Sequence, residues 1–77
     1  MKIVKISLTD LEDIKEFNRI TCSHHDLNAQ LSVGGYKVDP KSLVGLFTFD
    51  TGTKLELTIF SDNYNDYLSD ISKFLVD

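Results

Sequence analysis

Proline, cysteine and tryptophan are scarce in this chain of 77 residues, which has one proline, one cysteine and no tryptophan. With only four glycines and a hydrophobic fraction of 42%, the composition is typical of a folded globular domain and excludes a disordered, low-complexity chain. A chain of this length buries one modest core. We therefore expect residues 1–77 to form a single domain without a linker or an internal repeat.

Positive charge is also in deficit. Twelve acidic residues against eight basic ones give a net charge of -4, the wrong sign for a protein that neutralises nucleic-acid phosphates. No apolar run approaches the roughly 20 residues that span a bilayer, and the first residues alternate polar with apolar side chains, unlike a signal peptide. The sequence therefore predicts a cytoplasmic protein that binds neither nucleic acid nor membrane.

The single cysteine, Cys22, has no internal partner for a disulfide and lacks the Cys and His spacing of a zinc site. Free cysteine usually behaves as a small hydrophobic residue, so we expect Cys22 in the core. No metal ion or other cofactor is predicted.

The first third of the chain predicts a strand and a helix. Apolar residues alternate with polar ones over 2–8, which is typical of a strand with one buried face. Thr9 and Glu12 have the spacing of a capping box, so a helix is expected to begin near Asp10 and to end near Ser23. The residues expected to face the core from this helix are Leu11, Ile14, Phe17 and Thr21.

The middle of the chain predicts a hairpin and a short helix. Strands are expected over 27–33 and 36–38, and Gly34-Gly35 between them supplies the two positive φ angles of a type I′ turn. Asp39-Pro40 is a helix-start pair, with the aspartate as cap and the proline in the first turn. Gly45 within that helix indicates a close backbone approach. The apolar residues of the helix are Leu43, Val44, Leu46 and Phe47.

The last third predicts a fourth strand over 54–60 and a final helix, with possible caps at 61–63. The apolar stripe of that helix consists of Tyr64, Tyr67, Leu68, Ile71, Phe74 and Leu75. The order of elements is β-α-β-β-α-β-α, which predicts an α+β open-faced sandwich: a four-stranded antiparallel sheet with three helices on one face.

A motif in the middle of the chain resembles one family. Gly35 and Val38, followed by Lys-Ser-Leu-Val-Gly-Leu over 41–46, are similar to the hairpin glycine and the second-helix segment of HPr, the histidine-containing phosphocarrier of the bacterial sugar phosphotransferase system. The order of elements and the chain length agree with the HPr layout. The resemblance implies the HPr fold over nearly the whole chain.

The resemblance fails where HPr carries its chemistry. HPr proteins begin their first helix with a His-Ala-Arg-Pro run, whose histidine accepts a phosphoryl group from enzyme I. In an ungapped comparison, Leu11 stands at the histidine, Asp13 at the arginine and Ile14 at the proline. A leucine has no nucleophilic atom, and the acidic helix start opposes a phosphate. The comparison therefore implies a degenerate site, as in the catabolite-repression paralogue of HPr, which has also lost its histidine.

Two histidines, His24 and His25, lie near the end of the first predicted helix, far from that position. Either is an alternative phosphoryl acceptor, or the pair is half of a metal site. Adjacent side chains point in different directions, and no third Cys or His ligand is nearby in the sequence. We therefore favour a structural role for both.

Ser42 is the candidate regulatory site. In Gram-positive HPr proteins the serine of the Lys-Ser motif is phosphorylated by an ATP-dependent kinase, and the modified protein binds a transcriptional regulator. The resemblance therefore implies phosphorylation at Ser42, with Lys41 as a nearby cation. The alternative is that Ser42 serves only as a helix cap.

The apolar residues around Ser42 are a candidate partner surface, because HPr proteins meet their partners in this region. The candidate surface consists of Lys41, Leu43, Phe47 and Phe49, and for Phe49 we favour the core. Leu11 is expected on the core stripe of the first helix, and the alternative is that it joins this surface.

No nucleophile–base pair, phosphate loop or paired carboxylates can be placed, so no enzyme activity is predicted. The leading interpretation is a non-catalytic HPr-like regulatory or interaction protein. The alternatives are a phosphocarrier with a relocated histidine and a purely structural interaction domain.

Overall fold

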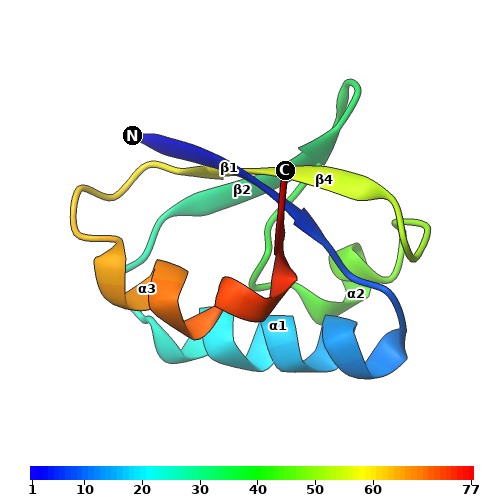
Figure 1. The fold of residues 1–77 in the computed structure, drawn as a ribbon, viewed down its shortest axis with the longest axis horizontal. Coiled ribbons are helices and arrows are strands. Elements are labelled where there is room, and N and C mark those ends of the chain that lie inside the picture. Colours follow the sequence, from blue (N-terminus) through cyan, green and yellow to red (C-terminus); the bar gives the residue numbers. More distant parts are fainter.

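The computed structural model describes residues 1–77 and consists of one antiparallel sheet with helices packed on one face (Figure 1). The strands are β1 (Lys2–Ser7), β2 (Ala29–Val33), β3 (Tyr36–Val38), β4 (Lys54–Ile59) and β5 (Leu75–Val76). The helices are α1 (Leu11–Ser23), α2 (Leu43–Leu46), α3 (Asn65–Asp70) and the 3-10 helix η1 (Ser72–Phe74). The α+β open-faced sandwich is therefore confirmed.

The sheet has five strands in the order β3-β2-β4-β1-β5, one more than predicted, and every pair is antiparallel. The fifth strand comes from the segment predicted as the end of the last helix. Helix α3 stops at Asp70, the chain tightens into η1, and Leu75 then becomes extended and pairs with Ile6 of β1. Tyr67, Ile71 and Phe74 are buried as the helical stripe predicted, because the tighter turn still carries Phe74 to the core.

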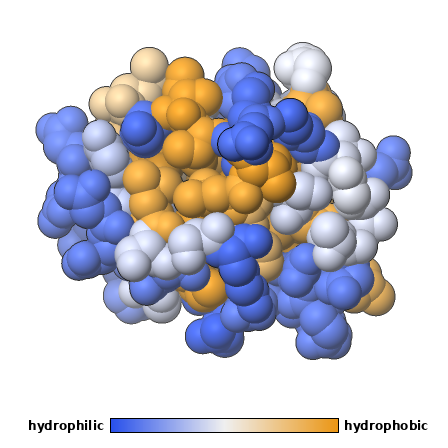
Figure 2. All heavy atoms as spheres, in the orientation of Figure 1, coloured by the Kyte–Doolittle hydropathy of each residue, from blue (hydrophilic) through white to orange (hydrophobic).

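The core lies between the sheet and the helices. Alternation along β1 and β4 turns Ile6, Leu55 and Leu57 inward, and α1 adds Ile14 and Phe17. Phe17 meets Phe74 edge to face at a centroid distance of 5.9 Å, which joins α1 to η1. On the face of the molecule seen in Figure 2, an apolar band runs over β1 and the C-terminal segment, where Leu75 and Val76 stay partly exposed.

Helix α1 begins and ends where predicted, but its cap is shifted by one residue. Asp10, not Thr9, is the N-cap, and its carboxylate accepts the N–H of Asp13 at 2.9 Å. Asp13 in turn accepts the N–H and the hydroxyl of Thr9, at 3.0 and 2.7 Å. The side-chain hydrogen bonds at the start of α1 are therefore made by the carboxylates of Asp10 and Asp13. The predicted capping box of Thr9 with Glu12 is wrong.

The predicted turn before β3 and the predicted start of α2 are also wrong in detail. Only Gly34 has a positive φ, 58°, so the hairpin turn is not type I′, which needs two; a single positive φ at the first position is the pattern of type II′. Asp39 and Pro40 form a turn before the helix, and Ser42 is the cap of α2. A side chain at Gly45 would lie 3.3 Å from Ser42 Oγ and 3.4 Å from Val38 Cβ, which confirms the predicted close approach.

Three further predictions fail, for Cys22, for the caps at 61–63 and for Leu11. Cys22 is exposed, one position beyond the buried Thr21, and its thiol donates to the carbonyl of Lys41 at 3.5 Å. The polar residues over 61–63 do not cap α3, whose N-cap is Tyr64 without a side-chain bond. Ser61 instead accepts the N–H of Asn28 at 2.9 Å. Leu11 is also 57% exposed, so the buried stripe of α1 begins at Ile14.

Candidate functional site

The segment 39–47 places the predicted regulatory serine at the surface. The carbonyl and the carboxylate of Asp39 accept the N–H groups of Ser42 and Lys41, both at 2.9 Å, which closes the turn before α2. Ser42 then accepts the N–H of Gly45 on its hydroxyl oxygen at 3.2 Å. Because Ser42 is exposed, its hydroxyl remains open to solvent while it caps the helix.

Three hydrogen bonds hold this segment against the C-terminal half of α1. Asn18 donates to the carbonyl of Pro40 at 3.3 Å, and the thiol of Cys22 donates to the carbonyl of Lys41. The ammonium of Lys41 donates to the carbonyl of His25 at 3.1 Å. The ammonium of Lys41 is therefore anchored at the end of α1, and it forms no hydrogen bond with the side chain of Ser42.

Helix α2 presents most of its apolar side chains to solvent. Leu46 is fully buried and fixes the helix on the core, whereas Leu43, Val44 and Phe47 are 36%, 79% and 45% exposed. We call Ser42, Leu43, Val44 and Phe47 the α2 surface. Phe49 does not belong to it, because Phe49 is 9% exposed and packs edge to face on Tyr36 at 5.5 Å. The prediction that Phe49 is core is confirmed.

Leu11 lies on the side of α1 that faces α2. Residues 11, 18 and 22 are seven and eleven positions apart, which places them along one line of an α-helix. Asn18 and Cys22 of that line bond to the loop before α2. The exposed Leu11 therefore borders the same side of the molecule as the α2 surface, where α2 lies beside α1 (Figure 1).

The start of α1 carries no imidazole. Leu11 is the first helical residue and is exposed, Asp13 is half-buried, and Ile14 is in the core. The hydrogen bond from the Thr9 hydroxyl, followed by that from the Thr9 N–H, holds the pKa of Asp13 below its usual 3.8. The carboxylate is thus fixed in its charged form at the helix start.

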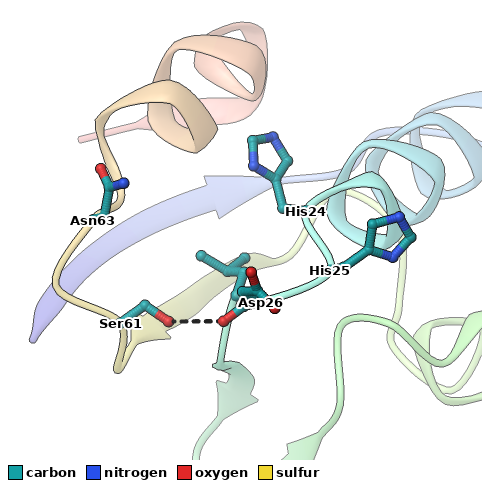
Figure 3. A pocket seen from close by; sticks show the side chains of 6 residues that line it. His24, His25, Asp26, Ser61 and Asn63 are labelled. Atoms are coloured by element: carbon teal, nitrogen blue, oxygen red, sulfur yellow. Dashed lines mark hydrogen bonds between the residues drawn. The ribbon is translucent and has the colours of Figure 1, made fainter.

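The two histidines point apart beside a surface hollow of about 250 Å³ (Figure 3). His24 is the C-cap of α1, and its Nε2 lies 2.9 Å from a carboxylate oxygen of Asp70 on α3. Its ring packs edge to face on Tyr67 at 5.2 Å. His25 is exposed, and its backbone carbonyl accepts the hydrogen bond from the ammonium of Lys41. No three His, Cys, Asp or Glu side chains are grouped to hold a metal ion.

Sequence reasoning missed the partners of His24. Asp70 and Tyr67 are three residues apart on α3, so they lie on one side of that helix, but nothing in the sequence relates them to His24, which lies far earlier in the chain. The side chains of Thr21 and Tyr67 are likewise joined, with their hydroxyl oxygens 2.7 Å apart in the core. The apolar stripes predicted that both helices cover the sheet, and only the fold shows how they meet.

Comparisons with known proteins identify the fold. No protein-family model matches the chain, and no curated protein matches it significantly. Among solved structures, the crystal structure of HPr-C-His from Thermoanaerobacter tengcongensis matches with a TM-score of 0.75 and 18% sequence identity, over 95% of this chain and 89% of that one. The chain therefore has an HPr-like fold. None of its helices has the length and the apolar composition needed to cross a bilayer.

Proposed function

We propose that this HPr-like fold belongs to a non-catalytic protein of the sugar phosphotransferase and carbon-regulation type, which acts by binding other proteins through the α2 surface. The observation that carries the proposal is the exposure of Leu43, Val44 and Phe47 beside an exposed serine, on a helix that the buried Leu46 holds in place. Exposed apolar side chains that gather around one polar residue are typical of a docking site. Such a role places the protein in the cytosol.

The proposal that the protein is not an enzyme and not a histidine phosphocarrier is supported by the start of α1. A phosphoryl acceptor needs a nucleophilic atom, and Leu11 has none. The carboxylates of Asp10 and Asp13 cap the helix start, so a phosphate there meets negative charge. Enzyme I charged with phosphoenolpyruvate is expected to transfer no phosphate to the protein; label on a histidine would contradict this.

Phosphorylation of Ser42 is the proposed switch. A phosphoserine carries a charge of about -1.5 to -2 at neutral pH, and here it lies next to the apolar side chains of Leu43 and Val44. The modification therefore changes the charge of the docking site and with it the choice of partner. The partners of this proposal are an HPr-kinase-like enzyme, which installs the phosphate from ATP, and a transcriptional regulator, which binds the modified protein.

The first experiment tests the modification. The protein is incubated with an HPr-kinase-like enzyme and ATP, and the product is mapped by mass spectrometry. One phosphate is expected on Ser42, and Ser42→Ala is expected to abolish it. Ser69→Ala, at an exposed serine on α3, is the matched control and should be phosphorylated like the parent. Phosphate that persists in Ser42→Ala would contradict the proposed site.

The second experiment tests the docking. Partners captured by the parent protein are compared with those captured by Ser42→Asp and by Phe47→Asp, and Ser69→Asp is the control. Both changes at the α2 surface are expected to alter the captured set, and the change on α3 is not. If all four proteins capture the same set, the domain has no switch, and the purely structural alternative is favoured.

His24 supports a second candidate function, a phosphocarrier with a relocated histidine. The carboxylate of Asp70 at 2.9 Å orients the ring by accepting the proton of Nε2, which leaves the lone pair on Nδ1 as a nucleophile. Under this alternative, acid-labile phosphate appears on the parent protein and disappears in His24→Ala. His25→Ala is the control, because the side chain of His25 contacts no carboxylate within the molecule.

A further inference from the structure

A hollow of about 370 Å³ lies over β2, apart from the α2 surface. The residues whose side chains differ in chemistry around it are Asn28, Gln30, Lys37, Asp39 and Phe60. Because β2 lies between β3 and β4 in the sheet, Lys37 and Asp39 form one wall and Phe60 forms the other. Asn28 and Gln30 form a polar floor between a charged wall and an aromatic one.

The hollow opens on the sheet face that the helices leave uncovered. Val38 and Ile59 turn towards the core, so Lys37 and Phe60 next to them turn outward. Lys37 is exposed, and the ring of Phe60 is 51% exposed. Both walls are therefore accessible to a ligand from solvent.

The strand pairing determines what fits across the hollow. The register of β2 with β3 places Asp39 opposite Gln30, so Asp39 fills the place in line with β3 and no further strand can add there. Adjacent strands are about 4.8 Å apart, so the backbones of β3 and β4 on the two sides of β2 are about 10 Å apart. This width suits a small molecule that lies across β2 with one end at each wall.

Lys37 and Asp39 place opposite charges on one wall. No salt bridge joins them, and Lys37 has no other carboxylate partner within the chain. The carboxylate of Asp39 accepts the N–H of Lys41 through one of its two oxygens, at 2.9 Å, and is thereby held at the hollow. A ligand with a single charge is attracted by one of these groups and repelled by the other, whereas a zwitterion is attracted by both.

We propose that the hollow binds a free α-amino acid with a large apolar side chain. Its carboxylate meets the ammonium of Lys37, and its ammonium meets the carboxylate of Asp39. Its side chain lies across the floor and packs on the ring of Phe60, which removes apolar surface of both from water.

The two charges distinguish a free amino acid from a residue within a polypeptide, whose amide groups carry neither charge. The aromatic wall distinguishes large apolar side chains from small ones, because glycine and alanine do not reach across β2. This site goes beyond the proposed docking role and does not depend on phosphorylation of Ser42.

The test uses phenylalanine, three related compounds and the amide resonances of the isotope-labelled protein. L-phenylalanine is expected to shift the resonances of Gln30, Lys37 and Asp39 with a dissociation constant on the order of millimolar, as for a ligand of this size. L-phenylalaninamide lacks the carboxylate and N-acetyl-L-phenylalanine lacks the ammonium, so each is expected to bind about threefold more weakly, the effect of one exposed ion pair. Glycine is expected to cause no saturable shift.

Variants assign each charge to its wall residue. In Lys37→Gln the preference for L-phenylalanine over its amide is expected to disappear. In Asp39→Asn, which keeps an oxygen for the N–H of Lys41, the preference over the N-acetyl compound is expected to disappear. Phe60→Ala is expected to weaken the binding of all three phenylalanine compounds.

The controls are Lys15→Gln on α1 and Asp66→Asn on α3, which make the same charge changes at exposed positions and should bind like the parent. Equal binding of the three phenylalanine compounds to the parent would overturn the proposal, and so would the absence of shifts at Gln30 and Lys37. Either result leaves the proposed function of the α2 surface untouched.

Discussion

The hydroxyl groups of Thr21 and Tyr67 meet in the core, 2.7 Å apart, and form the buried polar link between α1 and α3. Thr21 is fully buried and Tyr67 is 1% exposed, so neither hydroxyl can exchange this partner for water. Each satisfies the other, and no buried side-chain N or O atom in the chain is left without a partner.

Tyr67→Phe is expected to lower the free energy of unfolding by about 1–3 kcal/mol, because it leaves the Thr21 hydroxyl buried and unpaired. Tyr67→Phe combined with Thr21→Val is expected to recover part of that loss, since both polar groups are then removed. Urea denaturation followed by circular dichroism measures both. Tyr36→Phe is the control, because the hydroxyl of Tyr36 bonds to Thr48 at the surface. A double variant less stable than Tyr67→Phe would contradict this account.

The same link predicts a loss of stability at high pH. Burial, partly offset by the hydrogen bond from Thr21, raises the pKa of Tyr67 from 10.0 to about 12. Between these two values the unfolded chain loses the phenolic proton and the folded chain keeps it. The stability that this group contributes is therefore complete below pH 10 and is lost as the pH rises towards 12. The urea midpoint of the parent should fall over this range, and that of Tyr67→Phe should fall less.

The lowered pKa of Asp13 predicts a loss of stability at low pH. The bonds from the Thr9 hydroxyl and N–H lower the pKa of Asp13 below 3.8, so the folded state holds the carboxylate when the unfolded chain protonates it. Its contribution is present above pH 3.8 and is lost as the pH falls through the lowered value. Asp13→Asn should therefore flatten the acid side of the stability profile. Glu12→Gln, at the exposed neighbouring position, is the control and should keep the parent's slope.

The sequence was sufficient for most of the fold because local patterns determine it. Period-two alternation gave β1, β2 and β4, and the apolar spacing of α1 placed Phe17 and Thr21 in the core. The end of the chain is not determined by such a pattern. Phe74 faces the core equally well from an α-helix and from a 3-10 turn, so periodicity cannot distinguish a continued helix from η1 followed by β5.

The candidate site was less predictable, because it depends on contacts between distant segments. The burial of Phe49 involves Tyr36, which belongs to another element. The chemistry of a free thiol predicts a buried Cys22, yet its helix position turns it towards the loop at Lys41. The hollow over β2 follows from the length of β3, which is set by where the chain leaves the sheet.

Loss of the Ser42 side chain is expected to lower the stability of the protein, and this effect must be separated from the proposed regulatory role of Ser42. The serine oxygen accepts the N–H of Gly45, and loss of such a cap costs about 1 kcal/mol. Ser42→Ala is therefore expected to lower the urea midpoint, whereas Ser42→Asp keeps an acceptor and should stay close to the parent. If Ser42→Asp proves as unstable as Ser42→Ala, its changed partners in the capture experiment no longer support the switch.

Substitutions at Phe47 and Phe49 distinguish a docking role from a packing role. The two phenylalanines are only two residues apart, but Phe47 is exposed and Phe49 is buried. Phe49 is 9% exposed and its ring packs on Tyr36, so Phe49→Ala is expected to cost about 3 kcal/mol of unfolding free energy. Phe47 is 45% exposed, and Phe47→Ala is expected to cost less than about 1 kcal/mol. Thermal and urea unfolding of the two variants measure the difference directly. A large loss of stability in Phe47→Ala would place this ring in the core and remove the central residue of the α2 surface.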